Sequence, residues 1–252
     1  MIQTYKAHLI EKQQMSPDVF MFRFQLPEGQ NVEFVPGQYL ILFVPQGQTK
    51  ARRLFSINTP PKKDGTFELL VKIIPGGVAS EYVSRLTKEE EVLFQGPAGM
   101  FQLRPRQKNI VFMATGTGLA PIRSILLSMA NSQWLIANGQ QIRTDLFWGL
   151  RTSQDAYYLD EFETLKKQFS GFSYNLCFSR DEQFEKIPQE QKSVCITGRI
   201  PDAMEKIANN TNLKIDNASD YYLCGGRDAV ETFRHYLYGR GIEKENVFFE
   251  KF

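Results

Sequence analysis

Residues 114–121, ATGTGLAP, stand between an apolar run and a run with helical spacing. Gly116 and Gly118 permit positive φ angles and let the backbone approach a ligand closely, and Pro121 suits the first turn of a helix. A helix that begins at such a turn offers unpaired N–H groups to a phosphate. The stretch lacks the third glycine of the dinucleotide fingerprint, and short glycine motifs also occur in plain turns. Alone, it leaves a phosphate cradle and a tight strand-to-helix turn equally open.

The residues on either side of this stretch alternate between strand-like and helical runs. A buried strand is predicted at 109–114 and a helix at 120–130, and the alternation continues at 144–150, 159–169, 172–179, 193–197, 201–208, 220–225 and 229–239. This order predicts a parallel sheet covered by helices on both faces. Ligands of such sheets bind at the carboxyl ends of the strands, which is where ATGTGLAP stands.

The first hundred residues have a different pattern. Short apolar runs, separated by proline and glycine clusters, predict strands at 19–26, 38–44, 53–57, 67–74 and 91–95. This spacing is typical of an antiparallel barrel or sandwich, with one helix-like insert at 78–86. The change of pattern lies within 102–109, so we expect two domains, 1–103 and 104–252.

Composition excludes several classes of protein. The 252 residues are 42% hydrophobic and 23% charged, with a formal net charge of +2, which is too close to neutral to argue for nucleic acid or an anionic membrane as partner, and we expect neither. No apolar stretch approaches the roughly 20 residues of a membrane span, and the first residues do not resemble a signal peptide, so we expect a cytoplasmic protein. Three cysteines without a CxxC pattern and two histidines suggest neither disulfides nor a metal site.

Polar residues follow three predicted strands of the second half. The second strand ends in Arg151, where a NAD-binding domain usually carries an acid, and the third ends in Ser179 and Arg180. A hydroxyl and a guanidinium suit a 2′-phosphate, although Arg180 could instead be a solvated charge that pairs with Asp181 or Glu182. A later strand ends in Cys224 before two glycines, which predicts either open space above the sheet or a buried thiol and a turn.

Two segments of the first half could hold a flavin dinucleotide. Arg53 and Phe55 share one face of a predicted strand and Ser56 takes the other. Gly76 and Gly77 precede the helix-like insert and form a second candidate phosphate cradle. Standing alone, both segments favour an ordinary strand and a glycine turn.

Seven motifs occur in one order along nearly the whole chain: FVPGQY (34–39), RLFS (53–56), GGVAS (76–80), GPAGMF (96–101), GTGLAP (116–121), YLCGG (222–226) and the final EKF. This order resembles the ferredoxin–NADP⁺ reductase superfamily. The resemblance implies a two-domain fold, with an N-terminal antiparallel Greek-key barrel for the flavin and a C-terminal α/β parallel-sheet domain for the nucleotide. The segment VFFEKF is similar to reductase components of bacterial ring-hydroxylating oxygenases, and residues 198–201, GRIP, to bacterial ferredoxin/flavodoxin reductases.

The resemblance also implies residue roles at the flavin. Arg53 would contact the FAD pyrophosphate, Phe55 would stack on the isoalloxazine in place of the usual tyrosine, and Ser56 would hydrogen-bond near N5. The flavin-binding set is completed by Leu54, Gly76, Gly77, Val78, Ala79, Ser80 and Phe252. Phe252 would cover the flavin, its alternative being a frayed terminus.

At the nucleotide, the resemblance implies a pyrophosphate loop of Thr115, Gly116, Thr117 and Gly118. Arg151, Ser179 and Arg180 would hold the 2′-phosphate of NADP(H). Cys224 and Gly225 would lie beside the nicotinamide, and Glu250 would relay a proton. Ser56, Cys224 and Glu250 are therefore the predicted catalytic residues.

The expected function is exchange of hydride between NADP(H) and FAD, with single electrons passing to or from a separate ferredoxin or flavodoxin. No cluster of four cysteines is present for a fused iron–sulfur domain. One alternative is an NADH-dependent oxygenase reductase or an enzyme like cytochrome b5 reductase. Others are a non-catalytic subunit that binds flavin or nucleotide, and a nucleotide-binding protein without flavin.

Overall fold

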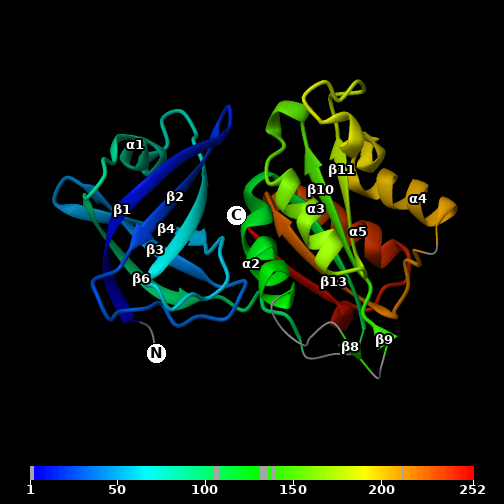
Figure 1. The fold of residues 1–252 in the computed structure, drawn as a ribbon, viewed down its shortest axis with the longest axis horizontal. Coiled ribbons are helices and arrows are strands. Elements are labelled where there is room, and N and C mark those ends of the chain that lie inside the picture. The colour runs from blue at the N-terminus through cyan, green and yellow to red at the C-terminus, as the bar shows by residue number, and fades with distance from the viewer. Residues whose placement is uncertain (1–2, 105–107, 131–135, 138–139, 212) are drawn as a thin grey trace. The chain divides into compact units, whose positions relative to one another are not determined.

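The computed structural model describes residues 3–104, 108–130, 136–137, 140–211 and 213–252. The chain divides into two compact units, Met1–Leu103 with Ala120–Ser128, and Arg104–Leu119 with Met129–Phe252. Each unit carries its own six-stranded sheet (Figure 1). The change of pattern expected within 102–109 falls in part on residues 105–107, which lie outside the described residues.

The first unit is an antiparallel barrel. Its strands are paired in the order β4-β3-β6-β1-β2-β5, and a bridge between Ile57 and Leu69 joins the two ends of this order. The elements are β1 (Gln3–Ser16), β2 (Val19–Gln25), β3 (Tyr39–Gln46), β4 (Thr49–Ser56), β5 (Thr66–Lys72), α1 (Val78–Arg85) and β6 (Glu91–Ala98). The sequence pattern does not predict β1, because the buried Tyr5, Ala7 and Leu9 of this strand give way to exposed residues in its second half.

Aromatic side chains from three strands fill the core of the first unit. The ring centroids of Phe24 and Phe94 are 4.9 Å apart with the rings edge to face, and those of Phe67 and Phe94 are 5.2 Å apart. All three rings are fully buried. Such pairs add stability beyond the area that they bury, so this cluster fixes how β2, β5 and β6 face one another.

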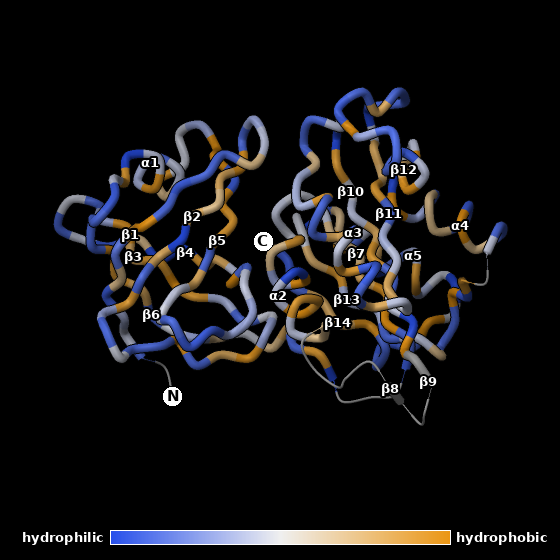
Figure 2. Tube along the Cα trace, in the orientation of Figure 1, coloured by the Kyte–Doolittle hydropathy of each residue, from blue (hydrophilic) through white to orange (hydrophobic). Residues whose placement is uncertain are grey.

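The second unit is a parallel sheet with helices, as the alternating pattern predicts. Its strands lie in the order β12-β11-β10-β7-β13-β14, and every pair is parallel. Hydrophobic residues concentrate along its strands, whereas its loops are mostly hydrophilic (Figure 2). The elements are β7 (Asn109–Thr115), α2 (Leu119–Ala130, largely counted with the first unit), β8 (Ile136–Ala137), β9 (Gln140–Gln141), β10 (Thr144–Leu150), α3 (Leu159–Gln168), β11 (Phe172–Phe178), β12 (Cys195–Thr197), α4 (Ile200–Asn210), β13 (Ser219–Gly225), α5 (Arg227–Gly239) and β14 (Val247–Lys251).

The order of these strands reverses beside β7. From β7 the chain moves outward through β10, β11 and β12, and it then returns to the other side of β7 with β13 and β14. In open parallel sheets, ligands bind in the crevice at this reversal, outside the carboxyl ends of the strands. The ends of β7 and β13 therefore mark where a ligand of the second unit is expected.

The described residues contain neither a membrane-spanning helix nor a cluster of metal ligands. None of their helices has the length and apolar character needed to cross a membrane. Among the same residues, no group of three or more His, Cys, Asp or Glu side chains could hold a metal ion.

Candidate functional site

The ends of β7 and β13 meet where the strand order reverses. Their register pairs Ala114 with Cys224, so Thr115 and Gly225 come next on the two strands. Gly225 has a φ of +154°, and a Cβ at this position would overlap Oγ1 of Thr115. Glycine is therefore required here for the two strand ends to approach each other.

The two glycines of ATGTGLAP do different things. A Cβ on Gly118 would lie 2.8 Å from the backbone nitrogen of Gly225 and closer still to the carbonyl group of Cys224. Gly116 has a φ of +51°, and no atom lies within 4 Å of the position its Cβ would take. Gly118 thus serves the packing of the fold, whereas Gly116 makes the left-handed turn and leaves open space beside the backbone.

A hydrogen bond from a buried tryptophan holds the turn at Gly116 in place. The indole Nε1 of Trp148 donates a hydrogen bond of 3.0 Å to the carbonyl oxygen of Gly116. Trp148 is itself fully buried, with its ring 4.7 Å from that of Tyr157 in an edge-to-face arrangement. The loop between β7 and α2 is therefore supported by the packed core of the second unit.

The three polar residues predicted at the next strand ends lie side by side. The N–H of Ser179 donates to the carbonyl oxygen of Leu150 over 3.0 Å, and that of Arg180 donates to the carbonyl oxygen of Arg151 over 2.9 Å. These bonds extend the pairing of β10 and β11 past the ends of the strands. The side chains of Arg151, Ser179 and Arg180 are all exposed, so two guanidinium groups and a hydroxyl share one edge of the sheet.

Asp181 is not the partner of Arg180. Its carboxylate accepts hydrogen bonds from the backbone N–H groups of Ser153 (2.8 Å), Phe184 (2.9 Å) and Gln183 (3.1 Å). These bonds, that from Ser153 first, lower the pKa of Asp181 to about 2. The carboxylate fastens the loop that follows Arg180 and is committed to backbone donors.

Cys224 and Glu250 face each other across β13 and β14. The register of the two strands pairs them directly, and Cys224 is fully buried while Glu250 is half-buried. Burial first, and then the charge of Glu250, raise the pKa of the Cys224 thiol well above its usual range. The thiol is therefore protonated at neutral pH.

Phe252 continues β14 rather than fraying. Its N–H donates to the carbonyl oxygen of Gly225 over 3.2 Å, and its carbonyl oxygen accepts from the N–H of Arg227 over 3.2 Å. The ring is nevertheless 63% exposed. The backbone is thus fixed beside the end of β13, and the aromatic ring is presented to solvent.

The predicted flavin strand has an uncovered surface. Three consecutive residues of β4, Arg52 to Leu54, are exposed, and Leu54 is exposed to 57%. Phe55 and Ser56 are half-buried, and Phe55 packs against the barrel core. Because consecutive side chains of this strand are exposed, both of its faces are open to solvent here. The exposed Leu54 side chain is apolar surface that a planar ligand would cover.

The predicted second flavin segment begins α1. Gly76 has a φ of +73° with open space where a Cβ would stand, and Ser80 Oγ accepts a hydrogen bond of 2.9 Å from the N–H of Ile74. Val78, Ala79 and Ser80 are the first three residues of α1, and N–H groups in a first turn have no acceptor within the helix. Val78 and Ala79 pack against the same core as Phe55.

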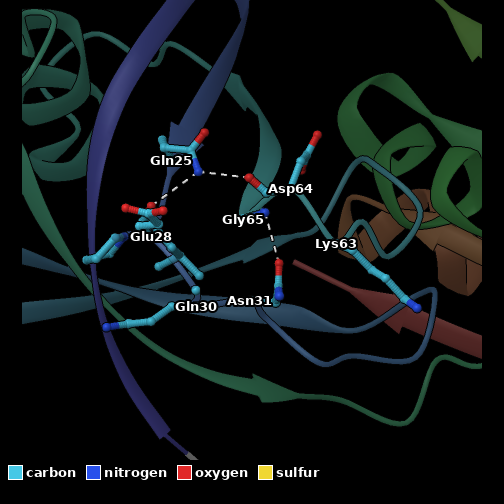
Figure 3. A pocket seen from close by; sticks show the side chains of 10 residues that line it. Gln25, Glu28, Gln30, Asn31, Lys63, Asp64 and Gly65 are labelled. Carbon is cyan, nitrogen blue, oxygen red and sulfur yellow. Dashed lines mark hydrogen bonds between the residues drawn. The ribbon is translucent and has the colours of Figure 1, made fainter.

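A separate pocket in the first unit contains none of the predicted site residues. It has a volume of about 440 Å³ and lies between residues 25–31 and 63–65. Figure 3 shows Gln25 directed at Asp64 and Asn31 at Gly65, with hydrogen bonds of 2.9 Å in both cases. These bonds connect the segments 25–31 and 63–65, so the pocket is the space left between two connected turns.

Some residues of the structure were not singled out by their sequence pattern. Trp148 supports the loop at Gly116 from within the apolar run of β10, where nothing in the sequence marks it as different from its neighbours. Arg123 is buried in α2, where a charge inside an apolar helical run was the available signal.

Known proteins resemble the chain in both halves. Residues 6–103 match the oxidoreductase FAD-binding domain family, and residues 112–235 match the oxidoreductase NAD-binding domain family. The chain is 30% identical over 251 residues to the 2-halobenzoate 1,2-dioxygenase electron transfer component of Burkholderia cepacia, covering 99% of this chain and 68% of that protein. It is 27% identical over 250 residues to ferredoxin–NADP reductase B of Sorangium cellulosum, covering 98% of this chain and 97% of that protein.

The fold has relatives among solved structures. The Amycolatopsis cytochrome P450 reductase GcoB superimposes with a TM-score of 0.83 at 24% identity, covering 100% of this chain and 70% of that one. The predicted fold class, an antiparallel flavin barrel followed by a parallel α/β unit, is confirmed.

Proposed function

We propose a function for this chain, which belongs to the ferredoxin–NADP⁺ reductase superfamily of FAD- and nicotinamide-dependent oxidoreductases: it exchanges hydride between NADP(H) and FAD. Single electrons then pass to or from a separate carrier of the ferredoxin or flavodoxin type. The relative from Sorangium cellulosum, which matches along nearly its whole length, supports this choice of partner. The proposal places the reaction in the cytoplasm, as the sequence predicts.

The choice of NADP(H) over NAD(H) rests on a cluster of three polar residues at the strand ends. Arg151, Ser179 and Arg180 share one edge of the sheet, and all three side chains are exposed. The acid nearest Arg180 in sequence, Asp181, is held by backbone N–H groups. A pair of guanidinium groups with a hydroxyl matches the charge and hydrogen-bonding geometry of a 2′-phosphate, so NADP(H) is favoured over NAD(H).

The loop at Gly116 would receive the pyrophosphate of the nucleotide. Gly116 leaves open space at the reversal of strand order, and the N-terminus of α2 supplies N–H groups and a favourable dipole. Beside it, Cys224 is fully buried, so its uncharged thiol would support the end of β13 beneath the nicotinamide rather than contact it. Glu250 would take part in proton transfer, as the resemblance implies. Gly118 supports this arrangement through packing.

The flavin site fits the residues of the barrel. Arg53 brings a positive charge for the pyrophosphate, together with the first N–H groups of α1. Phe55 and Leu54 offer apolar surface for the ring system, and the hydroxyl of Ser56 can donate a hydrogen bond at its reactive edge. FAD, when bound, supplies the redox chemistry, and the protein supplies position and electrostatics.

A second candidate is an NADH-dependent reductase component of an oxygenase. The identity to the Burkholderia cepacia electron transfer component favours it. A rival of another class is a non-catalytic subunit that binds flavin or nucleotide within a complex.

An anaerobic titration of the purified protein distinguishes these possibilities. We expect a yellow protein whose flavin absorption bands bleach on addition of NADPH, and at higher concentrations on addition of NADH. A preference for NADH would select the oxygenase-type reductase. A flavin that neither nucleotide reduces would leave the non-catalytic subunit, and a colourless protein that FAD cannot reconstitute would contradict the flavin site.

A further inference from the structure

A buried arginine lies in the middle of α2. The Arg123 side chain is 9% exposed, and its Nη1 donates a hydrogen bond of 2.7 Å to the carbonyl oxygen of Asn58. The next residue, Ser124, is fully buried, and its hydroxyl donates to the carbonyl oxygen of Thr59 over 2.6 Å. Burying a charge is costly unless the charge is paired, so the guanidinium needs a partner of opposite charge.

Glu68 provides the opposite charge. Its Oε2 lies 3.4 Å from Nη1 of Arg123, and its Oε1 accepts from Nε and Nη2 of Arg23 over 2.9 and 2.7 Å. The backbone carbonyl oxygen of Glu68 also accepts from the N–H of Asn58 over 2.8 Å. Asn58 is therefore held by β5 through its N–H and by α2 through its carbonyl oxygen.

These contacts adjoin both candidate sites along the chain. Asn58 and Thr59 follow Ser56, the residue expected near the reactive edge of the flavin, by two and three positions. In the other direction, Arg123 stands five residues after Gly118, which ends the nucleotide loop. Residues Ala120–Ser128 pack as part of the first unit, although the loop that precedes them belongs to the second.

We propose that Arg123 is a positioning residue for hydride transfer. Through its bond to Asn58, and within the first unit, it holds in place the segment that follows the end of β4 and with it Ser56. Glu68 orients the guanidinium, and Ser124 provides a second anchor. This inference rests on the proposed function, since it concerns transfer between nucleotide and flavin. Such transfer is sensitive to placement, and a shift of about 1 Å can lower a rate by about 100-fold.

Arg23 supplies a matched control. It bonds the same carboxylate of Glu68, but from β2, and its Nη1 pairs with Glu11 of β1 over 2.6 Å. Arg23→Lys and Arg123→Lys each keep the positive charge and lose the planar fork of the guanidinium. If the network only stabilises the barrel, both variants should behave alike in every rate.

The test is anaerobic stopped-flow reduction of the flavin over a range of NADPH concentrations, with FAD content and thermal unfolding measured on each variant. For Arg123→Lys we expect the limiting rate to fall by about 10- to 100-fold, while the dissociation constant of NADPH changes by less than about threefold. Ser124→Ala should lower the limiting rate in the same direction by a smaller factor. Arg23→Lys should keep the limiting rate within about twofold of the unaltered protein.

Equal limiting rates for Arg123→Lys and the unaltered protein would overturn the inference, as would an equal fall in Arg123→Lys and Arg23→Lys. If Arg123→Lys does not fold, Ser124→Ala decides, because it removes one neutral hydrogen bond and no charge. An unaltered protein whose flavin is not reduced by NADPH or NADH would contradict the proposed function instead, before any variant is compared.

Discussion

Gly118 lies so close to Cys224 that a Cβ at position 118 would overlap the carbonyl oxygen of that cysteine. The contact joins the loop after β7 to the end of β13, the two strands between which the sheet order reverses. Gly118, which the sequence motif assigns to phosphate binding, is thus required because the loop backbone packs directly against the backbone of β13. Gly116, with open space beside it, is the position that a ligand can approach.

This difference predicts different outcomes for two alanine substitutions. Gly118→Ala should lower the free energy of unfolding by about 3 kcal/mol or more, because backbone atoms must move to make room. Gly116→Ala should cost about 1–2 kcal/mol, from the left-handed conformation alone, and should weaken nucleotide binding by crowding the open side. Urea unfolding and nucleotide titration measure the two effects. Equal losses of stability would contradict this division of roles.

Ser56→Ala should slow reduction of the flavin more than it weakens nucleotide binding. The substitution removes a hydroxyl expected at the reactive edge of the flavin and leaves the nucleotide unit untouched, so we expect the limiting rate to fall by about tenfold with a nearly constant dissociation constant. Ser84→Ala, on the exposed side of α1, is the control. An unchanged rate of stopped-flow reduction in Ser56→Ala would remove this residue from the catalytic set.

Arg180→Ala should reduce kcat/KM for NADPH by about 10- to 100-fold and leave the value for NADH nearly unchanged. A charge-assisted hydrogen bond contributes about 1.5–3 kcal/mol, and NADH lacks the 2′-phosphate that would receive it. Arg151→Ala should shift the same ratio in the same direction. A ratio of NADPH to NADH efficiency that neither substitution alters would show that the two arginines bind something else.

Asp181→Asn should destabilise the protein in a pH-dependent way. The folded-state pKa of Asp181, about 2, is below the unfolded value of about 3.9. A lowered pKa contributes stability that is present above the unfolded value and is lost as the pH falls through the folded value. The difference in urea midpoint between the two proteins should be full at pH 6 and should shrink as the pH falls from about 4 toward 2. A difference independent of pH would mean that the hydrogen bonds, rather than the charge, matter.

Periodicity predicted the second unit closely. The strand expected at 144–150 is β10, and that expected at 220–225 is most of β13. Their apolar runs are buried on both faces, so the signal is strong and uninterrupted. β1 was missed because only the first half of the strand alternates between buried and exposed residues, and the exposed second half carries no pattern.

The contacts around Arg123 could not be predicted in this way. In a helix, a charged residue ordinarily marks the face toward solvent. Arg123 is instead buried, where it contacts the carboxylate of Glu68, 55 positions earlier in the chain. A local pattern does not report which distant side chain will lie opposite. The strand ends of the second unit were accessible to prediction because a parallel sheet brings them to one edge regardless of sequence distance.

The anchoring of α2 has a consequence for dissection of the chain. A fragment ending at Leu103, where the sequence pattern changes, would contain every strand of the barrel but would lack Arg123 and Ser124. The carbonyl oxygens of Asn58 and Thr59 would lose the donors Arg123 and Ser124, and Glu68 would lose its contact with Arg123. The barrel is therefore completed by a helix encoded after the first strand of its neighbour. We therefore expect a fragment that includes α2 to be more stable than one that ends at Leu103.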